Sequence, residues 1–344
     1  MQALVKTGAG VADLELKDWP EPYPAPDEVK LKIAAAGICG TDVHIIKGEW
    51  PSKPPVVLGH EFCGTIVEAG TQVRRFKPND RVVASNPAQT CGKCYHCRAG
   101  NPFMCLHRVS AGYMIDGAFA EYICIREERC HPLPDNVSFR QAALGEPMSV
   151  AIHAVIERTT VHAGDLVVVA GPGAVGLLTM VVAKLEGARV IVAGITKDQP
   201  RLALAKSLGA DFIVDSSKED LLGIVRRLSN DEGADLVYEC SGVAKSLDLC
   251  WEAVRREGTL AQVGIYPSRI ETDFNKVVMK ELNVVGSFGY VWDSWRRTIQ
   301  LLSERRVNTE ALISHELSLS QFQEAFRITQ DGTATKVVFN VGII

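Results

Sequence analysis

An apolar run followed at once by three closely spaced glycines constrains the fold of this 344-residue chain more than any other feature. Residues 166–170 read as a buried β-strand, and the segment from Gly171 through Gly173 to Gly176 opens a predicted helix over 174–186. In such a unit the first glycine permits a tight turn, the second lets the backbone approach a pyrophosphate, and the third packs helix on strand. The sequence therefore predicts a dinucleotide site here, with a merely structural turn as the alternative.

The same texture continues beyond residue 165, where short apolar strands alternate with helices. The predicted strands are 167–170, 190–193, 212–214, 236–238, 259–263 and 284–287. The predicted helices are 174–186, 200–208, 217–229 and 244–256. Strands joined by crossover helices indicate an α/β fold with a parallel, doubly wound sheet. The uncharged run 166–183 reaches the lower length of a membrane span, but its glycines and its proline favour strand, turn and helix instead.

The first 150 residues have a different texture, with short apolar runs broken by prolines and turn signals. These runs, at 29–33, 64–67, 81–84 and 120–125, predict an irregular β-barrel. A helix at 294–304 and a strand at 336–340 follow the parallel sheet, and we expect this tail to return to the first domain. The expected domains are therefore 1–154, an inserted nucleotide domain at 155–289, and a return segment at 290–344.

Composition and charge exclude several classes of function. A net charge of −4, with 37 Lys and Arg against 41 Asp and Glu, argues against a general nucleic-acid binder, which needs a basic surface. The N-terminus shows no basic stretch followed by an apolar one, so we expect no signal peptide and a cytoplasmic protein. The ten cysteines are then expected to be thiols or metal ligands and not disulfides.

Four of the cysteines have the spacing of a metal site. Cys91, Cys94, Cys97 and Cys105 form a C-x2-C-x2-C-x7-C pattern that one loop can wrap around a single ion. Four thiolates with no open position predict structural zinc, and an iron–sulfur cluster is the alternative. The isolated cysteines are expected to be mostly buried packing residues: Cys63, Cys124, Cys130, Cys240 and Cys250.

A second set of metal-ligand types lies scattered in the first domain. Cys39, His60, Glu61 and Glu146 are each weak evidence alone, since such residues are more often core or surface than ligands. A cysteine, a histidine and a glutamate that converge would give zinc three protein ligands and leave one position for water or substrate. The spacing alone does not establish that they meet.

The end of the second predicted strand bears on the choice of dinucleotide. A site specific for NAD normally has Asp or Glu about 20 residues after the glycines to bind the ribose hydroxyls, and here the strand ends in Gly194. Thr196, Lys197 and Arg201 are instead placed to meet a 2′-phosphate, although Asp198 lies beside them. The alternative is that both cations are solvated at the start of a helix.

Several motifs together resemble a known family. GICGTDVHIIKG, VLGHEFCGTIVEAG, KPNDRVV, CGKCYHCRAGNPFMC, GAFAEY and GPGAVG occur in the order found in zinc-containing medium-chain alcohol and polyol dehydrogenases. The resemblance covers essentially the whole chain and points to the sorbitol (L-iditol) and L-threonine dehydrogenase branch. It implies a Rossmann domain inserted in a chaperonin-10-like β-barrel catalytic domain, with the active site in the cleft between them. It also implies a homotetramer or homodimer.

The resemblance assigns roles to residues of this sequence. Cys39, His60, Glu61 and Glu146 match catalytic-zinc positions, with either glutamate as the direct ligand, and Cys91, Cys94, Cys97 and Cys105 match the structural site. The chain would thus hold two zinc ions. Thr41 matches the hydroxyl that contacts the substrate oxygen, and His44 matches the end of a proton relay. The remaining cofactor-binding positions expected are Val175, Val263, Gly264, Ile265, Ser287 and Phe288, and Phe288 and Tyr290 are candidates to face cofactor or substrate.

The implied reaction is hydride transfer between a secondary alcohol and NAD or NADP, with zinc lowering the pKa of the alcohol. Glu146 followed by Pro147 resembles the sorbitol enzyme, so a polyol, sugar alcohol or sugar acid is the first candidate substrate. L-threonine is the second candidate substrate, because the threonine branch has Asp-Pro-Phe at this point. The sequence also departs from sorbitol-type enzymes, since Ile45-Ile46 stands where they usually have an aromatic residue. A nucleotide binder without turnover would not need a ligand set and a relay, and a zinc-independent quinone-type reductase would lack both ligand sets.

Overall fold

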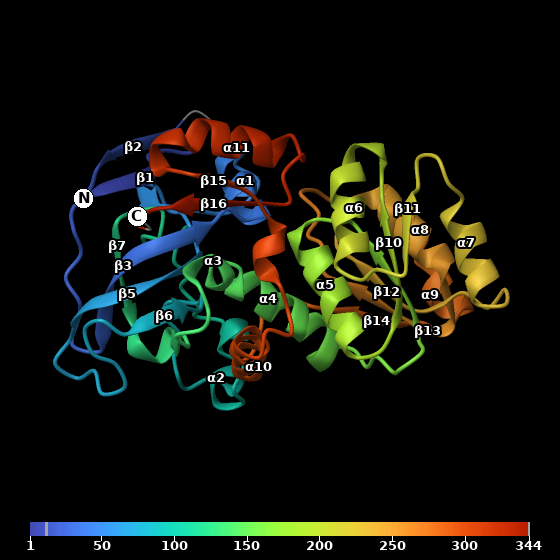
Figure 1. Cartoon of the computed structure of the whole chain (residues 1–344), viewed down its shortest axis with the longest axis horizontal. Coiled ribbons are helices and arrows are strands. Elements are labelled where there is room, and N and C mark those ends of the chain that lie inside the picture. The colour runs from blue at the N-terminus through green and yellow to red at the C-terminus, as the bar shows by residue number, and fades with distance from the viewer. Residues whose placement is uncertain (11–12, 343–344) are drawn as a thin grey trace. The chain divides into compact units, whose positions relative to one another are not determined.

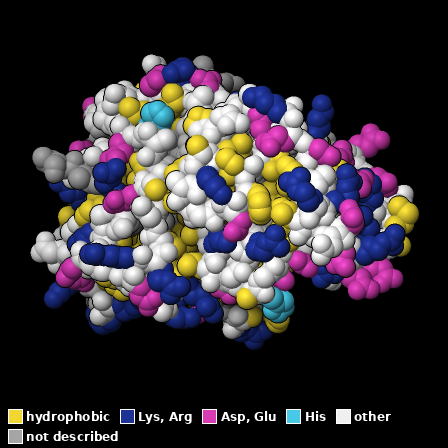
Figure 2. Space-filling model, turned by 45° about the vertical axis from the view of Figure 1, so that its right-hand side comes forward, with side chains coloured by type: hydrophobic (Ala, Val, Ile, Leu, Met, Phe, Trp, Pro, Cys, Tyr) yellow, Lys and Arg dark blue, Asp and Glu magenta, His cyan; other side chains and the backbone are white. Residues whose placement is uncertain are grey.

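The computed structural model describes residues 1–10 and 13–342 and divides into two compact units. The first unit comprises Met1–Glu146 with Tyr290–Ile344, and the second comprises Pro147–Gly289. Among the helices of the described residues, none is long and apolar enough to cross a membrane. Lysine and arginine side chains are interspersed with acidic ones over the face seen in Figure 2, as expected for a nearly neutral chain.

The second unit is built on a six-stranded parallel sheet of order β11-β10-β9-β12-β13-β14, which confirms the predicted doubly wound fold. The strands are β9 (Leu166–Ala170), β10 (Arg189–Gly194), β11 (Phe212–Asp215), β12 (Ala234–Glu239), β13 (Val254–Gln262) and β14 (Asn283–Gly286). The order of strands reverses between β9 and β12, and ligands of such sheets bind at the carboxyl ends of the strands beside that point.

Helices cover both faces of this sheet (Figure 1). The helices α5 (Ala174–Leu185) and α6 (Gln199–Ser207) cover one face, and α7 (Leu221–Leu228), α8 (Ala244–Ala253) and α9 (Asn275–Met279) lie on the other. Because the apolar strands are enclosed on both sides, Val167, Val168 and Val169 are fully buried.

Two predicted helices differ from the structure by three or more residues at one end, whereas the others agree within two residues. The helix predicted at 217–229 begins only at Leu221, because the Asp215 carboxylate accepts the Ser217 N–H at 3.1 Å and holds the preceding residues in a turn. The helix predicted at 244–256 ends at Ala253, because Val254 pairs with Ala234 and begins strand β13. Sheet pairing, a long-range interaction, overrides local helical preference there.

The first unit is rich in β-structure and contains two sheets. A three-stranded sheet joins β1 (Gln2–Lys6), β2 (Leu14–Asp18) and β4 (Val56–Val57). A seven-stranded sheet joins β3 (Glu28–Gly37), β5 (Glu61–Ala69), β6 (Arg81–Ala84), β7 (Tyr122–Arg126), β8 (Cys130–Pro132), β15 (Ile313–Leu317) and β16 (Lys336–Asn340). Its helices are α1 (Gly40–Ile46), α2 (Tyr95–Arg98), α3 (Phe139–Ala142), α10 (Trp292–Ser303) and α11 (Phe322–Gln330), and α4 (Gly145–Ile152) begins in it.

Long-range pairing in this larger sheet brings the two ends of the chain together. The long strand β3 pairs with β5 along most of its length, and its last residues also pair antiparallel with β16. Gly37 at the end of β3 is thereby flanked by Glu61 on one side and Val338 on the other. This register brings the metal-ligand candidates of β5 next to residues of the C-terminal strand.

Each of the three glycines in the turn after β9 has different surroundings, so each is required for a different reason or not required. Gly171 has a φ of +104°, and a Cβ there would lie 2.8 Å from the Ser241 backbone nitrogen. A Cβ on Gly176 would lie 1.9 Å from the Gly171 carbonyl oxygen, so this glycine allows α5 to approach the strand. Gly173 caps the N-terminus of α5 and faces open space. The first and third glycines therefore shape the loop, and the second leaves room beside it.

Gly176→Ala should lower the free energy of unfolding by about 1–3 kcal/mol, because the added methyl group cannot fit without moving the turn. Gly173→Ala is the matched control in the same loop and should unfold like the parent. Thermal unfolding without added dinucleotide measures both. Equal stability of the two variants would contradict the packing role of Gly176.

Candidate zinc and dinucleotide sites

Three of the predicted ligands meet at the start of α1 and β5. Cys39 ends the connection from β3 into α1, and His60 and Glu61 lie where the chain enters β5. One ligand atom from each of these residues lies within 4.8 Å of the others. His60 and Glu61 are buried and Cys39 is partly exposed, so the cluster has one accessible side.

A buried aspartate orients this cluster. Asp42 is fully buried, and its Oδ2 accepts the Cys39 backbone N–H at 2.8 Å. Its Oδ1 lies 3.5 Å from His60 Nδ1, and neither of these two atoms has a closer hydrogen-bond partner among the described residues. A metal-binding histidine commonly uses one ring nitrogen for the metal and the other for a carboxylate. This pairing leaves His60 Nε2 as the ring nitrogen that could bind a metal ion.

Lys336 provides a buried positive charge beside the same cluster. Its ammonium group forms an ion pair with Glu61 Oε2 and donates a hydrogen bond to the Ile38 carbonyl at 2.8 Å. Both side chains are almost wholly buried. Burial alone would lower the pKa of Lys336, but the Glu61 carboxylate raises it above the usual value, so the lysine stays charged. It balances part of the negative charge of the ligands.

Glu146 lies beside the three clustered ligands without belonging to them. It is buried near the start of α4, and burial together with the charge of Glu61 raises its pKa to about 7. The charges of His60 and Lys336 act on it in the opposite direction, so it is within electrostatic range of the cluster. Of the two glutamates, Glu61 is the one that the geometry groups with Cys39 and His60.

The predicted relay residues lie on one helix. Thr41 and His44 are three residues apart on α1 and therefore face the same side, and the Cys39 thiol is 3.7 Å from the Thr41 hydroxyl. His44 is partly exposed, and its Nδ1 lies 2.6 Å from Glu49 Oε2. Thr41 is thus close to the metal-ligand cluster, and His44 lies nearer the surface with a carboxylate beside it.

The four spaced cysteines form the second cluster, around α2. The sulfur atoms of Cys91, Cys94, Cys97 and Cys105 all lie within 4.8 Å of one another. Backbone N–H groups point at these sulfurs, for example from Cys94 to Cys91 at 3.4 Å and from His107 to Cys105 at 3.4 Å. Hydrogen bonds from the Lys93 and Cys94 backbones lower the pKa of Cys91 to about 6, which favours the thiolate that binds metal.

Both clusters fit zinc. The first offers a thiolate, an imidazole and a carboxylate, which is a donor set typical of a catalytic ion with one position left open. The second offers four thiolates, the donor set of a closed structural ion. His60 Nδ1 and Asp42 Oδ1 have no closer hydrogen-bond partner than each other among the described residues. A carboxylate on one ring nitrogen is the arrangement expected when the other ring nitrogen binds a metal.

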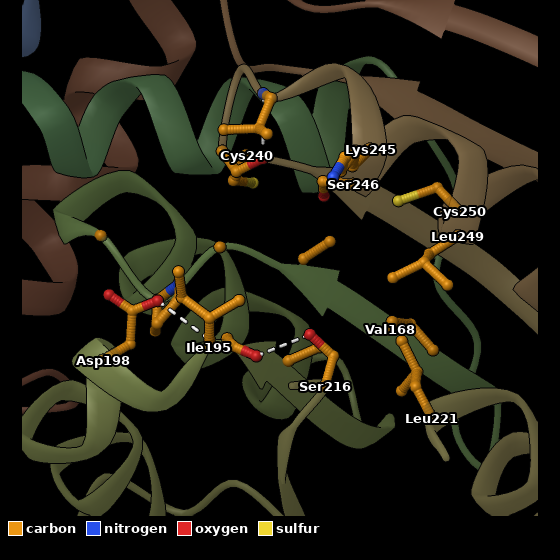
Figure 3. A pocket seen from close by; sticks show the side chains of 18 of the residues that line it. Val168, Ile195, Asp198, Ser216, Leu221, Cys240, Lys245, Ser246, Leu249 and Cys250 are labelled. Atoms are coloured by element: carbon orange, nitrogen blue, oxygen red, sulfur yellow. Dashed lines mark hydrogen bonds between the residues drawn. The ribbon is translucent and has the colours of Figure 1, made fainter. Parts of the chain in front are cut away.

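The second unit contains a pocket of about 680 Å³ at the carboxyl ends of β9, β10 and β12. Gly171 and Gly173 form part of its wall, and Figure 3 shows Ile195 and Ser216 on one side of it and Cys240 and Ser246 on the other. The pocket lies at the point where the strand order reverses, where doubly wound sheets bind nucleotides. Its size suits a large ligand.

The residues expected near the ribose have different surroundings. Lys197 and Arg201 both line the pocket, and Arg201 forms an ion pair with Asp198 at 3.2 Å. The Thr196 hydroxyl donates to Asp215 at 2.9 Å, so it holds the loop after β10 in place. Asp198 accepts the Ile195 N–H at 3.0 Å and serves as a local cap. Lys197, in the loop after β10, and Lys245, in the first turn of α8, are exposed lysines that line the pocket, and Lys197 is the one that follows the strand end at Gly194.

The other predicted cofactor positions are spread along neighbouring loops. Val175 and Gly176 lie in the first turn of α5, and the loop after β13 contains Val263, Gly264 and Ile265. Ser287 is buried after β14, and Phe288 is exposed beside it. None of these described residues lines the 680 Å³ pocket.

Tyr290, a candidate to face cofactor or substrate, is buried in the first unit, where its hydroxyl group is already hydrogen-bonded. Its hydroxyl donates to the Asn86 carbonyl and accepts the Asn86 N–H at 2.7 Å.

Comparisons with known proteins agree with this geometry. Residues 25–135 match the alcohol dehydrogenase GroES-like domain, and residues 174–304 match the zinc-binding dehydrogenase domain. The chain is 40% identical to a sorbitol dehydrogenase of Halalkalibacterium halodurans, covering 98% of both chains. It is 36% identical to an L-threonine 3-dehydrogenase of Rhizobium etli, covering 99% of this chain and 98% of that one.

A solved structure is similar as well. A zinc-binding dehydrogenase from Sinorhizobium meliloti 1021, bound to NADP, superposes with a TM-score of 0.89 at 32% identity and covers 98% of both chains. An inserted nucleotide-binding sheet and two zinc-type donor sets define a metal-dependent dehydrogenase. The chain belongs to the zinc-binding dehydrogenase family, as a zinc-containing, NAD(P)-dependent alcohol dehydrogenase. This confirms the predicted fold, enzyme class and cofactors.

Three residues of the site were not found from the sequence. Asp42 lies inside the GTDVH motif and reads as a helix N-terminal residue, and Glu49 reads as a surface charge. Lys336 begins the last strand, and its only signal is a charged residue at the head of the apolar run Val337–Phe339. Each acts through a partner that only the folded chain brings near.

Cys39→Ser should remove one of two zinc ions per chain and nearly all activity, because the ligand set of the open site loses its thiolate. Cys97→Ser should instead lower thermal stability and keep the catalytic ion in the molecules that remain folded. Metal analysis of the purified variants gives the count. Cys124→Ser is the control, since Cys124 belongs to neither cluster, and should retain both ions. Two zinc ions in Cys39→Ser would show that the first cluster is not a metal site.

Proposed function

We propose that this protein oxidises a polyol, sugar alcohol or sugar acid at a secondary hydroxyl, with Cys39, His60 and Glu61 as the catalytic-zinc ligands. The observation that carries the proposal is the convergence of these three side chains, within 4.8 Å, beside the hydroxyl of Thr41. When bound, the zinc ion acts as a Lewis acid on the alcohol and the nicotinamide ring carries the hydride. The other steps fall to side chains of the chain itself.

Those side chains hold charges and move a proton. Lys336 orients the Glu61 carboxylate through their ion pair, and Asp42 fixes the ring of His60. Thr41 accepts the proton of the substrate hydroxyl and donates its own toward His44, whose ring is held in place by the Glu49 carboxylate. Glu146, buried next to the ligands, is the candidate to hold a water or a substrate hydroxyl near the metal position.

The choice of a polyol over L-threonine rests on Glu146 and on the relatives. Sorbitol dehydrogenase is the more similar of the two relatives described above, and Glu146-Pro147 matches the sorbitol-type pattern. A panel of polyols, sugar acids and L-threonine with NAD and with NADP, followed by the absorbance of the reduced nicotinamide, tests this. Faster turnover of L-threonine than of every polyol would make the second candidate the function. The cytoplasmic location and the homotetrameric or homodimeric assembly stay predictions.

Thr41→Val should reduce kcat for alcohol oxidation by about 10²–10⁴ with zinc content unchanged, because the shape is kept and the hydroxyl is lost. Thr41→Ser keeps the hydroxyl and is the matched control. His44→Gln should cost less, since water can replace the terminal acceptor, and added imidazole should restore part of the rate. A Thr41→Val enzyme with parent-like kcat would exclude the relay.

The pocket mouth also favours acceptance of a 2′-phosphate. The strand end carries glycine where an NAD-specific site has an acidic residue, and Lys197 is exposed there. Gly194→Asp is a poor test, because a Cβ at Gly194 would lie 2.9 Å from Pro172 and 3.1 Å from Asp198 Cβ. A change at Lys197 avoids this crowding.

Lys197→Ala should raise the Kd for NADP about tenfold, the effect of losing about 1.4 kcal/mol from one charge-assisted contact, and leave the Kd for NAD within about twofold. Lys218→Ala is the control, because Lys218 is exposed, pairs with Asp215 at 3.4 Å and does not line the pocket. Calorimetric titration with each dinucleotide gives the constants. Equal weakening of NAD and NADP would show that Lys197 does not sit beside the 2′ position.

A further inference from the structure

A buried glutamate that is neither a zinc-ligand candidate nor part of the pocket wall lies at the carboxyl end of β12. Glu239 is fully buried and belongs to the second unit. Among the described residues it forms no ion pair with a lysine or arginine within 4.0 Å. Burying a carboxylate without a cation is costly unless several donors satisfy it. The donors that surround Glu239 are therefore informative.

Four donors, from the loop after β12 and from strand β13, converge on this carboxylate. From the loop after β12, Oε1 accepts the Ser241 N–H at 2.9 Å and the Ser241 hydroxyl, and Oε2 accepts the Gly242 N–H at 3.0 Å. From β13, Oε2 accepts Gln262 Nε2 at 2.8 Å, and the Tyr266 hydroxyl, which donates to Gln262 Oε1 at 3.0 Å, holds that amide in place. These donors occupy both carboxylate oxygens, so hydrogen bonds hold this buried side chain in place of an ion pair.

The backbone of the same residue adds to this connection. The Glu239 carbonyl accepts the N–H groups of Val263 and Gly264 at 2.9 and 2.8 Å. The two loops approach so closely that a Cβ on Gly264 would lie 2.4 Å from the Gly242 nitrogen and 2.6 Å from Glu239 Oε2. One residue thus fixes the loop after β12 and the loop after β13 against each other.

Ser241, which donates to Glu239, also packs against the glycine-rich turn after β9. Gly171 packs against Ser241 so tightly that a Cβ on Gly171 would lie 2.8 Å from the Ser241 nitrogen and 2.9 Å from its Cα. Ser241, whose N–H and hydroxyl both bind Glu239, also lines the pocket that contains Gly171 and Gly173. A displacement of Ser241 would therefore alter the wall on which a pyrophosphate is expected to lie.

We propose that Glu239 is a positioning residue of the dinucleotide site: it holds the loops after β12 and β13 together and, through Ser241, supports the turn at Gly171. The inference rests on the proposed function in so far as the pocket binds a dinucleotide. Glu239 itself is buried behind the pocket wall and acts through Ser241 and Gly242. Replacing one carboxylate oxygen by an amide would direct an NH₂ group at donors that need an acceptor.

The same strand offers a matched control at its other end. Asp235 lies near the amino end of β12, where its Oδ2 accepts the Leu166 N–H at 2.8 Å and its Oδ1 accepts Arg255 Nε at 2.8 Å. It therefore also joins neighbouring strands through its carboxylate, but at the edge of the sheet opposite the pocket. Asp235→Asn should lower stability without affecting dinucleotide binding.

The test compares Glu239→Gln with Asp235→Asn and the parent. Glu239→Gln should raise the Kd for NAD and for NADP at least tenfold in the folded protein, and raise the KM for dinucleotide with kcat at saturation within a few-fold. Hydrogen exchange without dinucleotide should speed up at 171–173, 240–243 and 263–266 in Glu239→Gln and not in Asp235→Asn. A Glu239→Gln protein with parent-like Kd and exchange, whatever its melting temperature, would overturn the proposal.

Two outcomes need separate readouts. If Glu239→Gln does not fold, Ser241→Ala takes its place, because it removes one donor to the carboxylate; it should raise the dinucleotide Kd several-fold, and a parent-like Kd would overturn the inference. If the parent binds neither NAD nor NADP, the proposed function fails, while the exchange measurement still decides whether Glu239 holds the loops.

Discussion

The buried ion pair between Glu61 and Lys336 joins strands from opposite ends of the chain and underlies the metal-ligand cluster. It forms because β3 pairs with β5 on one side and with β16 on the other. The attraction within a buried ion pair offsets the cost of desolvating both charges only when the geometry is good and further hydrogen bonds satisfy the two groups. The Ile38 carbonyl provides such a hydrogen bond for Lys336. Loss of either partner would leave a buried charge at the ligand site. Strand pairing and metal-site electrostatics are therefore coupled.

Carboxylates have similar supporting roles throughout this structure. Asp42 orients His60, Glu49 accompanies His44, and Asp215 holds the loop after β10 through Thr196. In the proposal for Glu239, a carboxylate again fixes loops at the functional edge of a sheet. Loops that bind ligands are otherwise the least restrained parts of such folds, and buried acceptors offer a way to fix them. In the function proposed here, the side chains that bind metal or move a proton are held in position by these other residues.

The sequence predicted the parallel sheet well because its signals are local. Six apolar runs, crossover helices and three glycines each reflect the conformation of neighbouring residues, and the last strand was predicted at its observed bounds, Lys336–Asn340. The predicted start of α7 was wrong because a turn at Asp215 precedes that helix, and the predicted end of α8 was wrong because Val254 pairs with Ala234. The four-cysteine cluster was evident from spacing, since one loop supplies all its ligands.

The sequence by itself determined the residue types and their local order: the cysteine spacing, the glycine turn after an apolar strand, and Thr41 three residues before His44 on one helix. Tertiary structure decided which distant side chains meet. It grouped Glu61 with Cys39 and His60, left Glu146 beside them, and brought Lys336 to the cluster. Spacing along the chain fixes distances within a loop or a helix. The approach of Lys336 to Glu61 depends instead on the register of β5 and of the C-terminal strand on either side of β3, which arises from packing of the whole unit.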